Sequence, residues 1–365
     1  MMKRVKKKRL VVLGSTGSIG CQTLDIVRAH ADFFEIIAMS AHSNKELFAM
    51  QCKEFAPRHA VVTSESKNSR AELGMLAQLD EADCIVNAIV GVAGVMSTLA
   101  AVRAGKTLAL ANKESLVMAG ELVMQLAHEH RARILPIDSE PSAIWQIVNG
   151  NMRDAAPTIE RITLTASGGP FYGKLRDELR HVTPEQALAH PTWKMGAKIS
   201  VDSATLMNKA FELIETRWLF NIPPEKLAVS IHRQSIVHAL VHWTDGSVGA
   251  AMSPPDMRIP ISQALFYPDR AVNPEIDMPR LDFSNLQLQF EAPDYSTFEA
   301  PKLAYEVMRE GGILPAVFCM ADEIAVQKFL RREIEFLDIV DEVKRTLDVT
   351  RNTPLSVEAL NELFI

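Results

Sequence analysis

The N-terminal region combines a hydrophobic strand, a glycine-rich turn and a helix, and this order restricts the fold more than any other feature of the chain. Residues 9–13 are apolar enough for a buried strand, and a helical pattern runs to His30. Between them, glycines stand at positions 14, 17 and 20. Such glycines allow a tight turn and bring backbone amides close to a pyrophosphate at the helix start. The region therefore indicates a dinucleotide-binding unit, although a purely structural glycine turn would have the same spacing.

A second predicted strand, residues 35–39, follows at the distance expected for a βαβ unit and ends in the sequence SAHSNK. No acidic residue stands at the end of this strand, where an Asp or Glu would bind the adenosine ribose hydroxyls of NAD. Ser43 and Asn44, with either His42 or Lys45, suit a ribose 2′-phosphate instead. The sequence thus favours NADP over NAD.

Three further strands are predicted at residues 84–90, 106–110 and 133–137, and helical segments separate them. This alternation predicts an α/β fold, with a Rossmann-like doubly wound parallel sheet in the N-terminal domain. Polar motifs follow the strands at residues 87–91, 111–115 and 138–140, at the sheet edge where open α/β folds bind ligands. Asp138 and Glu140 are spaced to face one hard cation, Mg²⁺ or Mn²⁺, and the alternative is a solvated acidic turn.

A predicted helix starts at Asp202 or Ser203, either of which suits the N-cap, and runs to Phe220. Asn208 and Lys209 share one face with Glu212, opposite an apolar stripe. Ser, Asn and Lys at a helix N-terminus favour a phosphate, whereas Glu212 would repel it unless a metal ion lay between them. The alternative is a capped amphipathic surface helix with a local ion pair.

Composition is typical of a cytoplasmic enzyme. The chain has 365 residues, 47% of them hydrophobic, and a net charge of −6, so neither a membrane span nor a nucleic-acid surface is indicated. The basic residues 3–9 lead directly into the first strand and not into the apolar region of a signal peptide. The four cysteines lie far apart, which argues against a zinc site or a disulfide scaffold and fits a reducing compartment.

The chain changes character after residue 150. Predicted strands at residues 161–166, 227–231, 235–243 and 247–252 form an antiparallel sheet suited to homodimerisation, with a hairpin at Thr244–Gly246. His238 and His242 are assigned to a solvent or interface face of this sheet, in preference to a metal site. The predicted domains are cofactor-binding (1–140), catalytic and dimerisation with a flap at 187–198 (141–267), a proline-marked linker (268–300) and a small C-terminal helical domain (301–365). Helices are expected at residues 301–310, 314–331, 334–346 and 356–363.

Seven motifs identify a family resemblance that covers nearly the whole chain. They are GSTGSIG at Gly14, ANKES at Ala111, PIDSE at Pro136, SGGPF at Ser167, HPTWKMG at His190, VDSATLMNK at Val201 and PPDMR at Pro254. In this order they resemble the 1-deoxy-D-xylulose 5-phosphate reductoisomerases, the second enzymes of the non-mevalonate isoprenoid pathway. No single motif is decisive, but the ordered set is highly specific.

The resemblance implies four groups of site residues. The metal ligands would be Asp138, Glu140 and Glu212. These carboxylates, with Lys209 and His190, would be the catalytic residues. The residues that bind the phosphorylated substrate would be Lys113, Ser139, Glu140, Ser167, His190, Ser203, Asn208, Lys209 and Glu212. NADPH would be bound by Thr16, Gly17, Ser18, Ile19, Ser43, Asn44, Asn112, Glu114 and Gly196. Trp193 and Met195 would cover the site when the flap closes.

The implied reaction is a metal-dependent rearrangement of 1-deoxy-D-xylulose 5-phosphate, followed by reduction with NADPH to 2-C-methyl-D-erythritol 4-phosphate. The chain departs from the family pattern at His42-Ser43, where a Gly-Lys or Gly-Arg pair is common, and at Asp322, where Asn is common. The first departure removes a cation and predicts weaker NADPH binding with some use of NADH, unless Lys45 compensates. A semialdehyde-type dehydrogenase and a catalytically inactive nucleotide sensor are the alternatives.

Overall fold

The computed structural model describes residues 6–271 and 278–350 and forms two compact units. The first unit contains residues 1–115, 121–142 and 256–279, and the second contains residues 116–120, 143–255 and 280–365. Each unit is described below by itself. The domain boundaries expected from the sequence remain a proposal, and the expected helix at residues 356–363 lies outside the described residues.

The first unit contains a six-stranded parallel sheet in the order β3-β2-β1-β4-β5-β6. Its strands are β1 (Lys8–Leu13), β2 (Phe34–Ala41), β3 (His59–Val62), β4 (Cys84–Asn87), β5 (Thr107–Leu110) and β6 (Arg133–Pro136). This order is that of a doubly wound dinucleotide-binding sheet, so the predicted fold class is confirmed. The sequence prediction omitted β3, which is only four residues long and has side chains that are half-buried or exposed.

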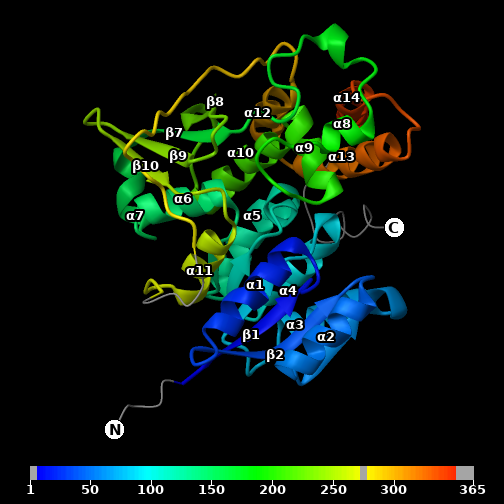
Figure 1. The fold of residues 1–365 in the computed structure, drawn as a ribbon, viewed down its shortest axis with the longest axis vertical. Coiled ribbons are helices and arrows are strands. Elements are labelled where there is room, and N and C mark those ends of the chain that lie inside the picture. The colour runs from blue at the N-terminus through cyan, green and yellow to red at the C-terminus, as the bar shows by residue number, and fades with distance from the viewer. Residues whose placement is uncertain (1–5, 272–277, 351–365) are drawn as a thin grey trace. The chain divides into compact units, whose positions relative to one another are not determined.

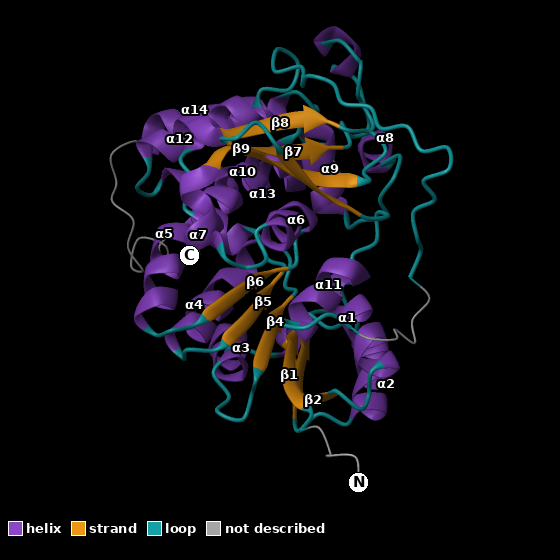
Figure 2. Ribbon diagram, turned by 90° about the vertical axis from the view of Figure 1, so that its left-hand side faces the viewer, coloured by secondary structure: helices purple, strands orange, loops and turns teal. Residues whose placement is uncertain are grey.

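Helices cover both faces of this sheet. They are α1 (Ser18–Ala29), α2 (Lys45–Phe55), α3 (Ser69–Ala77), α4 (Val95–Arg103) and α11 (Arg258–Phe266). Figure 2 shows α1 and α11 on one face and α3 and α4 on the other. Helices α5 (Glu114–Glu129) and α6 (Ser139–Ile147) follow β5 and β6 and run on into residues of the second unit. Helix α11, which the sequence did not predict, packs against α1, β5 and β6.

The glycine turn joins β1 to α1 with almost no free space. Gly14 has a φ of +84°, and the backbone amides of Gly14 and Ser15 donate to the carbonyl of Ser40 at the end of β2. A Cβ atom added at Gly20 would lie 2.2 Å from the Gly14 carbonyl oxygen and 2.6 Å from the Ser15 Cα. The first turn of α1 therefore packs directly on the glycine turn, which only a residue without a side chain permits.

We expect Gly20→Ala to lower the free energy of unfolding by about 1–3 kcal/mol and to weaken dinucleotide binding, because the added methyl group would meet fixed backbone. Thermal unfolding and a binding titration with NADPH would measure both effects. Gly74→Ala in α3 is the matched control, since its nearest neighbour would be the Ala100 Cβ at 4.0 Å. Equal stability of the two variants would contradict the tight packing of Gly20.

The second unit contains a four-stranded sheet in the order β10-β9-β7-β8. Its strands are β7 (Ile159–Ala166), β8 (Leu227–Ile231), β9 (Val237–Trp243) and β10 (Val248–Met252). The predicted hairpin between β9 and β10 is confirmed, but the prediction of a fully antiparallel sheet is wrong, because β7 and β8 are parallel. The long helical segment between β7 and β8 supplies the crossover that a parallel pair requires.

The described helices of this unit are α7 (Met152–Ala155), α8 (Pro184–Leu188), α9 (Ala197–Thr205), α10 (Met207–Phe220), α12 (Ala300–Glu310), α13 (Leu314–Leu330) and α14 (Asp338–Thr350). Figure 1 shows α12, α13 and α14 grouped together, and α12 packs against α10. The aromatic rings of Phe211 and Phe318, both fully buried, pack edge to face at 5.5 Å and join α10 to α13. Before α12 the chain is extended, and Glu291 pairs with Ile231 at the end of β8.

Two further sequence predictions are corrected in this unit. The helix expected to begin at Asp202 or Ser203 is two helices, because Leu206 has a φ of +60° and separates α9 from α10. Asp202 is consequently inside α9 and buried, and does not cap a helix. His238, expected on a solvent or interface face, is also buried and its Nε2 contacts the Ser253 hydroxyl at 3.0 Å. No helix in residues 6–271 and 278–350 meets the length and hydropathy of a membrane span.

Candidate active site

The glycine turn places the N-terminus of α1 just after the carboxyl end of β1. Thr16 and Gly17 lie in the turn, and Ser18 and Ile19 begin α1. Gly17 is the N-cap residue and has no side chain to accept from the first-turn amides, so these donors suit an anionic ligand. The structure therefore places four of the predicted cofactor residues where a dinucleotide pyrophosphate binds in this fold.

The end of β2 supplies a group of exposed side chains beside the glycine turn. Ser43 and Asn44 are both exposed, and the Asn44 carboxamide oxygen caps α2 by accepting from the Leu47 amide at 3.2 Å. Lys45 forms an ion pair with Glu65, which follows β3 in a short 3₁₀ turn. The sequence reading missed Glu65 because β3 itself was not predicted.

Asn112 and Glu114 follow β5 and lie at the carboxyl ends of β4 and β5. The Asn112 carboxamide nitrogen donates to the carbonyls of Ile89 and Gly91 at 2.9 and 2.8 Å, and to the Glu114 carboxylate at 2.9 Å. Asn112 is 1% exposed, so its side chain ties two loops together inside the unit. Its interior hydrogen bonds indicate that it positions the loops, a role that its place in the ANKES motif did not reveal.

Two predicted metal ligands lie where β6 leads into α6. The Lys113 ammonium contacts the Asp138 carboxylate at 2.5 Å, and the Ser139 hydroxyl donates to Glu140 at 2.6 Å. The Ser139 amide also donates to Asp138. Lys113 is almost fully buried, and its positive charge offsets that of Asp138. The first unit thus combines two carboxylates, a hydroxyl and a cation, which suits a hard metal ion and an oxygen-rich substrate.

The third predicted metal ligand, Glu212, lies in the second turn of α10. Its carboxylate accepts from the Asn208 side chain at 2.5 Å and contacts the ammonium of Lys209. Lys209 and Glu212 are 3% and 1% exposed. Because α10 begins at Met207, Asn208 and Lys209 occupy its first turn. The sequence predicted these two residues near a helix N-terminus, where they suit a phosphate, although the predicted start of the helix was wrong.

The loop after β7, which carries the predicted phosphate ligand Ser167, packs against the end of α9. Gly169 has a φ of +67°, and a Cβ atom there would lie 2.6 Å from the Ser203 carbonyl oxygen. This close approach sets the Ser167 loop against the end of α9. The Ser167 hydroxyl accepts from the Gly169 amide and contacts His190 Nε2 at 2.9 Å. Ser167 and His190 are therefore in contact, and the loop that carries Ser167 packs against the backbone of Ser203.

The hydrogen bonds of His190 define its protonation. Its Nδ1 atom accepts from the backbone amides of Thr192 and Trp193 at 3.1 and 2.9 Å, so the proton of the neutral ring lies on Nε2 and is donated to Ser167. Burial lowers the pKa of His190 below its usual value, which keeps the ring neutral. The hydroxyl proton of Ser167 can then be donated to an anionic oxygen.

The predicted flap connects α8 to α9 and is irregular between them. Trp193 and Met195 are half-buried in this loop, and the Trp193 ring lies 6.4 Å from the ring of His238. Gly196 is the N-cap of α9, and its carbonyl accepts from the Ser200 hydroxyl. Open and closed positions of the flap remain a prediction.

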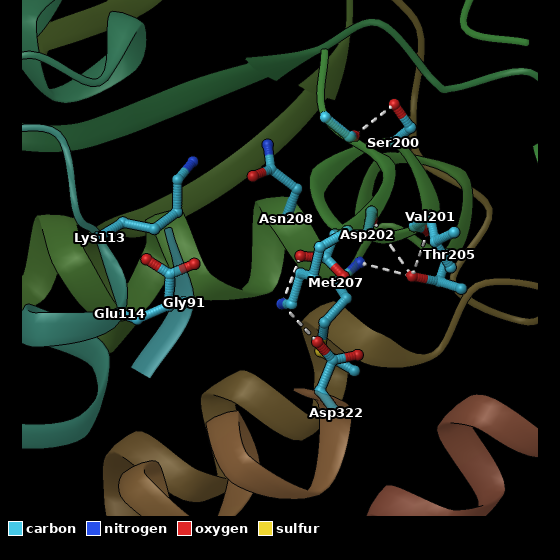
Figure 3. Close-up of polar contacts among 12 residues, drawn as sticks. Gly91, Lys113, Glu114, Ser200, Val201, Asp202, Thr205, Met207, Asn208 and Asp322 are labelled. Atoms are coloured by element: carbon cyan, nitrogen blue, oxygen red, sulfur yellow. Dashed lines mark hydrogen bonds and ion pairs between the residues drawn. The ribbon is translucent and has the colours of Figure 1, made fainter. Parts of the chain in front are cut away.

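A buried charge cluster anchors α9, and sequence reading did not single it out. The Lys198 ammonium contacts Asp202 at 2.5 Å and Asp322 of α13 at 2.7 Å. Figure 3 shows both aspartates as sticks. It also lies 4.6 Å from the centre of the Phe211 ring. The spacing of Lys198 and Asp202, four residues apart on one helix, was the only available sequence signal.

Three family models match the chain. The model described as 1-deoxy-D-xylulose 5-phosphate reductoisomerase matches residues 10–120, and two models of the C-terminal domains of this enzyme match residues 134–220 and 252–364. The chain belongs to the 1-deoxy-D-xylulose 5-phosphate reductoisomerase family. The predicted family and the prediction of an enzyme are thereby confirmed.

Reductoisomerase relatives match over nearly their full length. The enzyme of Caldanaerobacter subterraneus is 46% identical over 94% of this chain and 93% of its own, and that of Chlorobium chlorochromatii is 47% identical over 96% and 95%. The solved reductoisomerase of Zymomonas mobilis in complex with NADPH is 42% identical, with a TM-score of 0.88 over 98% of this chain and 96% of that one. A solved reductoisomerase in complex with NADPH, fosmidomycin and magnesium is 39% identical, with a TM-score of 0.86 over 97% and 90%.

Proposed function

We propose that this protein converts 1-deoxy-D-xylulose 5-phosphate to 2-C-methyl-D-erythritol 4-phosphate with NADPH and a divalent metal ion, in non-mevalonate isoprenoid precursor biosynthesis. The observation that carries the proposal is the similarity over 97% of the chain to a reductoisomerase solved with NADPH, fosmidomycin and magnesium. The protein is accordingly an NADPH-dependent oxidoreductase. The side chains of both units supply the donors and acceptors that this reaction requires.

Asp138, Glu140 and Glu212 are proposed to bind the divalent cation, Mg²⁺ or Mn²⁺. All three are carboxylates, and oxygen donors suit either ion. Asp138 forms an ion pair with Lys113, and Glu212 forms one with Lys209. These two carboxylates therefore already interact with positive charge. When bound, the metal ion acts as a Lewis acid on adjacent oxygens of the substrate. Ser139, Lys113 and Lys209 are then the groups of the chain that orient these oxygens.

The phosphate of the substrate is proposed to bind to Ser167, Ser203, Asn208 and Lys209, with His190 beside them. The neutral His190 ring holds Ser167 through Nε2, so the serine hydroxyl is oriented to donate to a phosphate oxygen. This phosphate is remote from the bond that rearranges. Its binding energy can therefore be used to orient the substrate and to close the flap, where Trp193 and Met195 would exclude water.

NADPH is proposed to bind across the carboxyl ends of β1, β2, β4 and β5. The turn residues Thr16 and Gly17, with Ser18 and Ile19, provide amides for the pyrophosphate. Ser43 and Asn44 would lie near the adenosine ribose. Asn112 holds the loop after β4 and contacts Glu114, and Gly196 is the N-cap of the helix after the flap. When bound, NADPH supplies the hydride for reduction of the rearranged aldehyde.

The activity is tested by following NADPH absorbance with 1-deoxy-D-xylulose 5-phosphate as substrate. We expect oxidation with Mg²⁺ or Mn²⁺, loss of turnover on addition of EDTA and recovery on addition of excess metal, because the proposed carboxylates must bind the ion for the substrate to rearrange. NADH in place of NADPH measures the strictness of cofactor choice. Metal-independent oxidation would exclude the metal assignment, and no oxidation under any condition would exclude the proposed substrate.

A homodimer and a cytoplasmic location complete the proposal. Strand β10 is at the edge of its sheet, and Val248 on it is 50% exposed, which suits pairing with a second copy. All four cysteines are free thiols in the structure, as expected in a reducing compartment. Light scattering on the purified protein measures the oligomeric state.

A further inference from the structure

An ion pair joins the segment after β2 to the short turn after β3. The ammonium of Lys45, the first residue of α2, lies 2.5 Å from the carboxylate of Glu65. Both side chains are 57% exposed. Beside this pair, His42 Nδ1 contacts the Thr63 hydroxyl at 2.9 Å, so the loop after β2 and the turn after β3 are joined by two polar contacts.

This ion pair lies just beyond the end of β2, the strand that binds the glycine turn. The Ser40 carbonyl near the end of β2 accepts from the amides of Gly14 and Ser15, which fixes β2 beside the start of α1. In a sheet of this order, a dinucleotide with its pyrophosphate at α1 places its adenosine ribose near the end of β2. The ribose 2′ position therefore faces the segment from His42 to Lys45.

Few groups in that segment can recognise a 2′-phosphate. Lys45 is the sole Lys or Arg between Ala41 and Phe48. The Asn44 carboxamide oxygen caps α2, so only the carboxamide nitrogen can donate to a phosphate, and both this group and the Ser43 hydroxyl are uncharged. Recognition of the two negative charges of the phosphate thus depends chiefly on Lys45, whose ammonium is shared with Glu65.

We propose that Glu65 is a specificity-determining residue that limits the preference for NADPH by competing with the 2′-phosphate for Lys45. The inference rests on the proposed function only in taking NADPH as the cofactor. Glu65 acts in two ways, since its carboxylate holds the ammonium and also repels the phosphate. An exposed ion pair is weak, so the phosphate displaces Glu65 at a moderate loss of affinity. NADH has no phosphate at this position and does not have to break the pair.

The test compares 2′,5′-ADP with 5′-AMP, which differ by the 2′-phosphate alone, in calorimetric titrations of the full chain. Glu65→Gln is expected to raise the affinity for 2′,5′-ADP by about threefold to fivefold and to leave that for 5′-AMP unchanged. Lys45→Met is expected to lower the affinity for 2′,5′-ADP alone. Both differences should diminish at high salt, because the groups are exposed.

The matched control is Glu54→Gln. Glu54 forms an exposed ion pair with Arg28 at the other end of α2, so this variant breaks a similar pair on the same helix away from β2. It should change neither affinity. A Glu65→Gln variant that binds both nucleotides as the unmodified protein does would overturn the proposal. Absence of any NADPH binding by the unmodified protein would instead count against the proposed function.

Discussion

Glu212→Gln is expected to lower kcat by about a thousandfold while NADPH binding stays within about twofold of the unmodified protein. The substitution removes the negative charge of a proposed metal ligand but keeps a side chain of the same shape. Glutamine can still accept a hydrogen bond from Asn208 or Lys209 through its remaining oxygen, so α10 should retain its packing. NADPH contacts are assigned to residues of other segments and should not change.

Three measurements separate this effect from a loss of folding. Steady-state kinetics give kcat, a fluorescence titration gives the NADPH affinity, and electron paramagnetic resonance of Mn²⁺ reports metal binding directly. Glu225→Gln, in the 3₁₀ turn after α10, is the control, because Glu225 is exposed and pairs loosely with Arg309 at 3.8 Å. Unchanged turnover in Glu212→Gln would show that Glu212 does not bind the catalytic metal.

Lys198→Met is expected to destabilise the second unit by about 3–5 kcal/mol. Methionine keeps the apolar stem against Phe211 but removes the charge that lies between Asp202 and Asp322. Both aspartates are buried, so two carboxylates would lose their cation in a region of low dielectric constant. Urea unfolding followed by tryptophan fluorescence measures the loss, because Trp193 and Trp218 lie in this unit.

Two variants control for the loss of a lysine and for the loss of one carboxylate. Lys302→Met changes an exposed lysine of α12 and should alter stability by less than about 0.5 kcal/mol. Asp322→Asn keeps an oxygen that accepts from Lys198 and leaves one carboxylate opposite one ammonium, so it should be far less harmful than Lys198→Met. Equal stability of Lys198→Met and Lys302→Met would show that the buried cluster contributes little.

Asp322 departs from the family pattern, and the structure shows what this residue contacts. The family resemblance implied only that an aspartate stands here in a context where asparagine is common. The structure shows that this aspartate is fully buried and contacts Lys198, which also contacts Asp202. Contacts between residues separated by 124 positions cannot be read from a linear pattern, since periodicity reports only neighbours along one element.

Prediction was most accurate where the signal was local. The strand, glycine turn and helix at the N-terminus were predicted to within a few residues, because hydrophobic runs and glycines act on their immediate neighbours. Errors arose where tertiary contacts override local preference. Leu206 adopts a positive φ that no leucine favours, and it divides one predicted helix into α9 and α10. The parallel pairing of β7 with β8 likewise depends on the path of the intervening chain.

The amino-acid sequence was sufficient to predict the α/β fold class, the family and the candidate site residues, because these predictions depend on ordered motifs and on the period of hydrophobic residues. The contacts that engage those side chains became visible in the folded chain. The structure showed that His190 is held neutral against Ser167, that Asn112 is committed to two loops, and that Lys45 is shared with Glu65. Hydrogen bonds, burial and ion pairs join residues far apart in the chain, so they exist only once the backbone has folded.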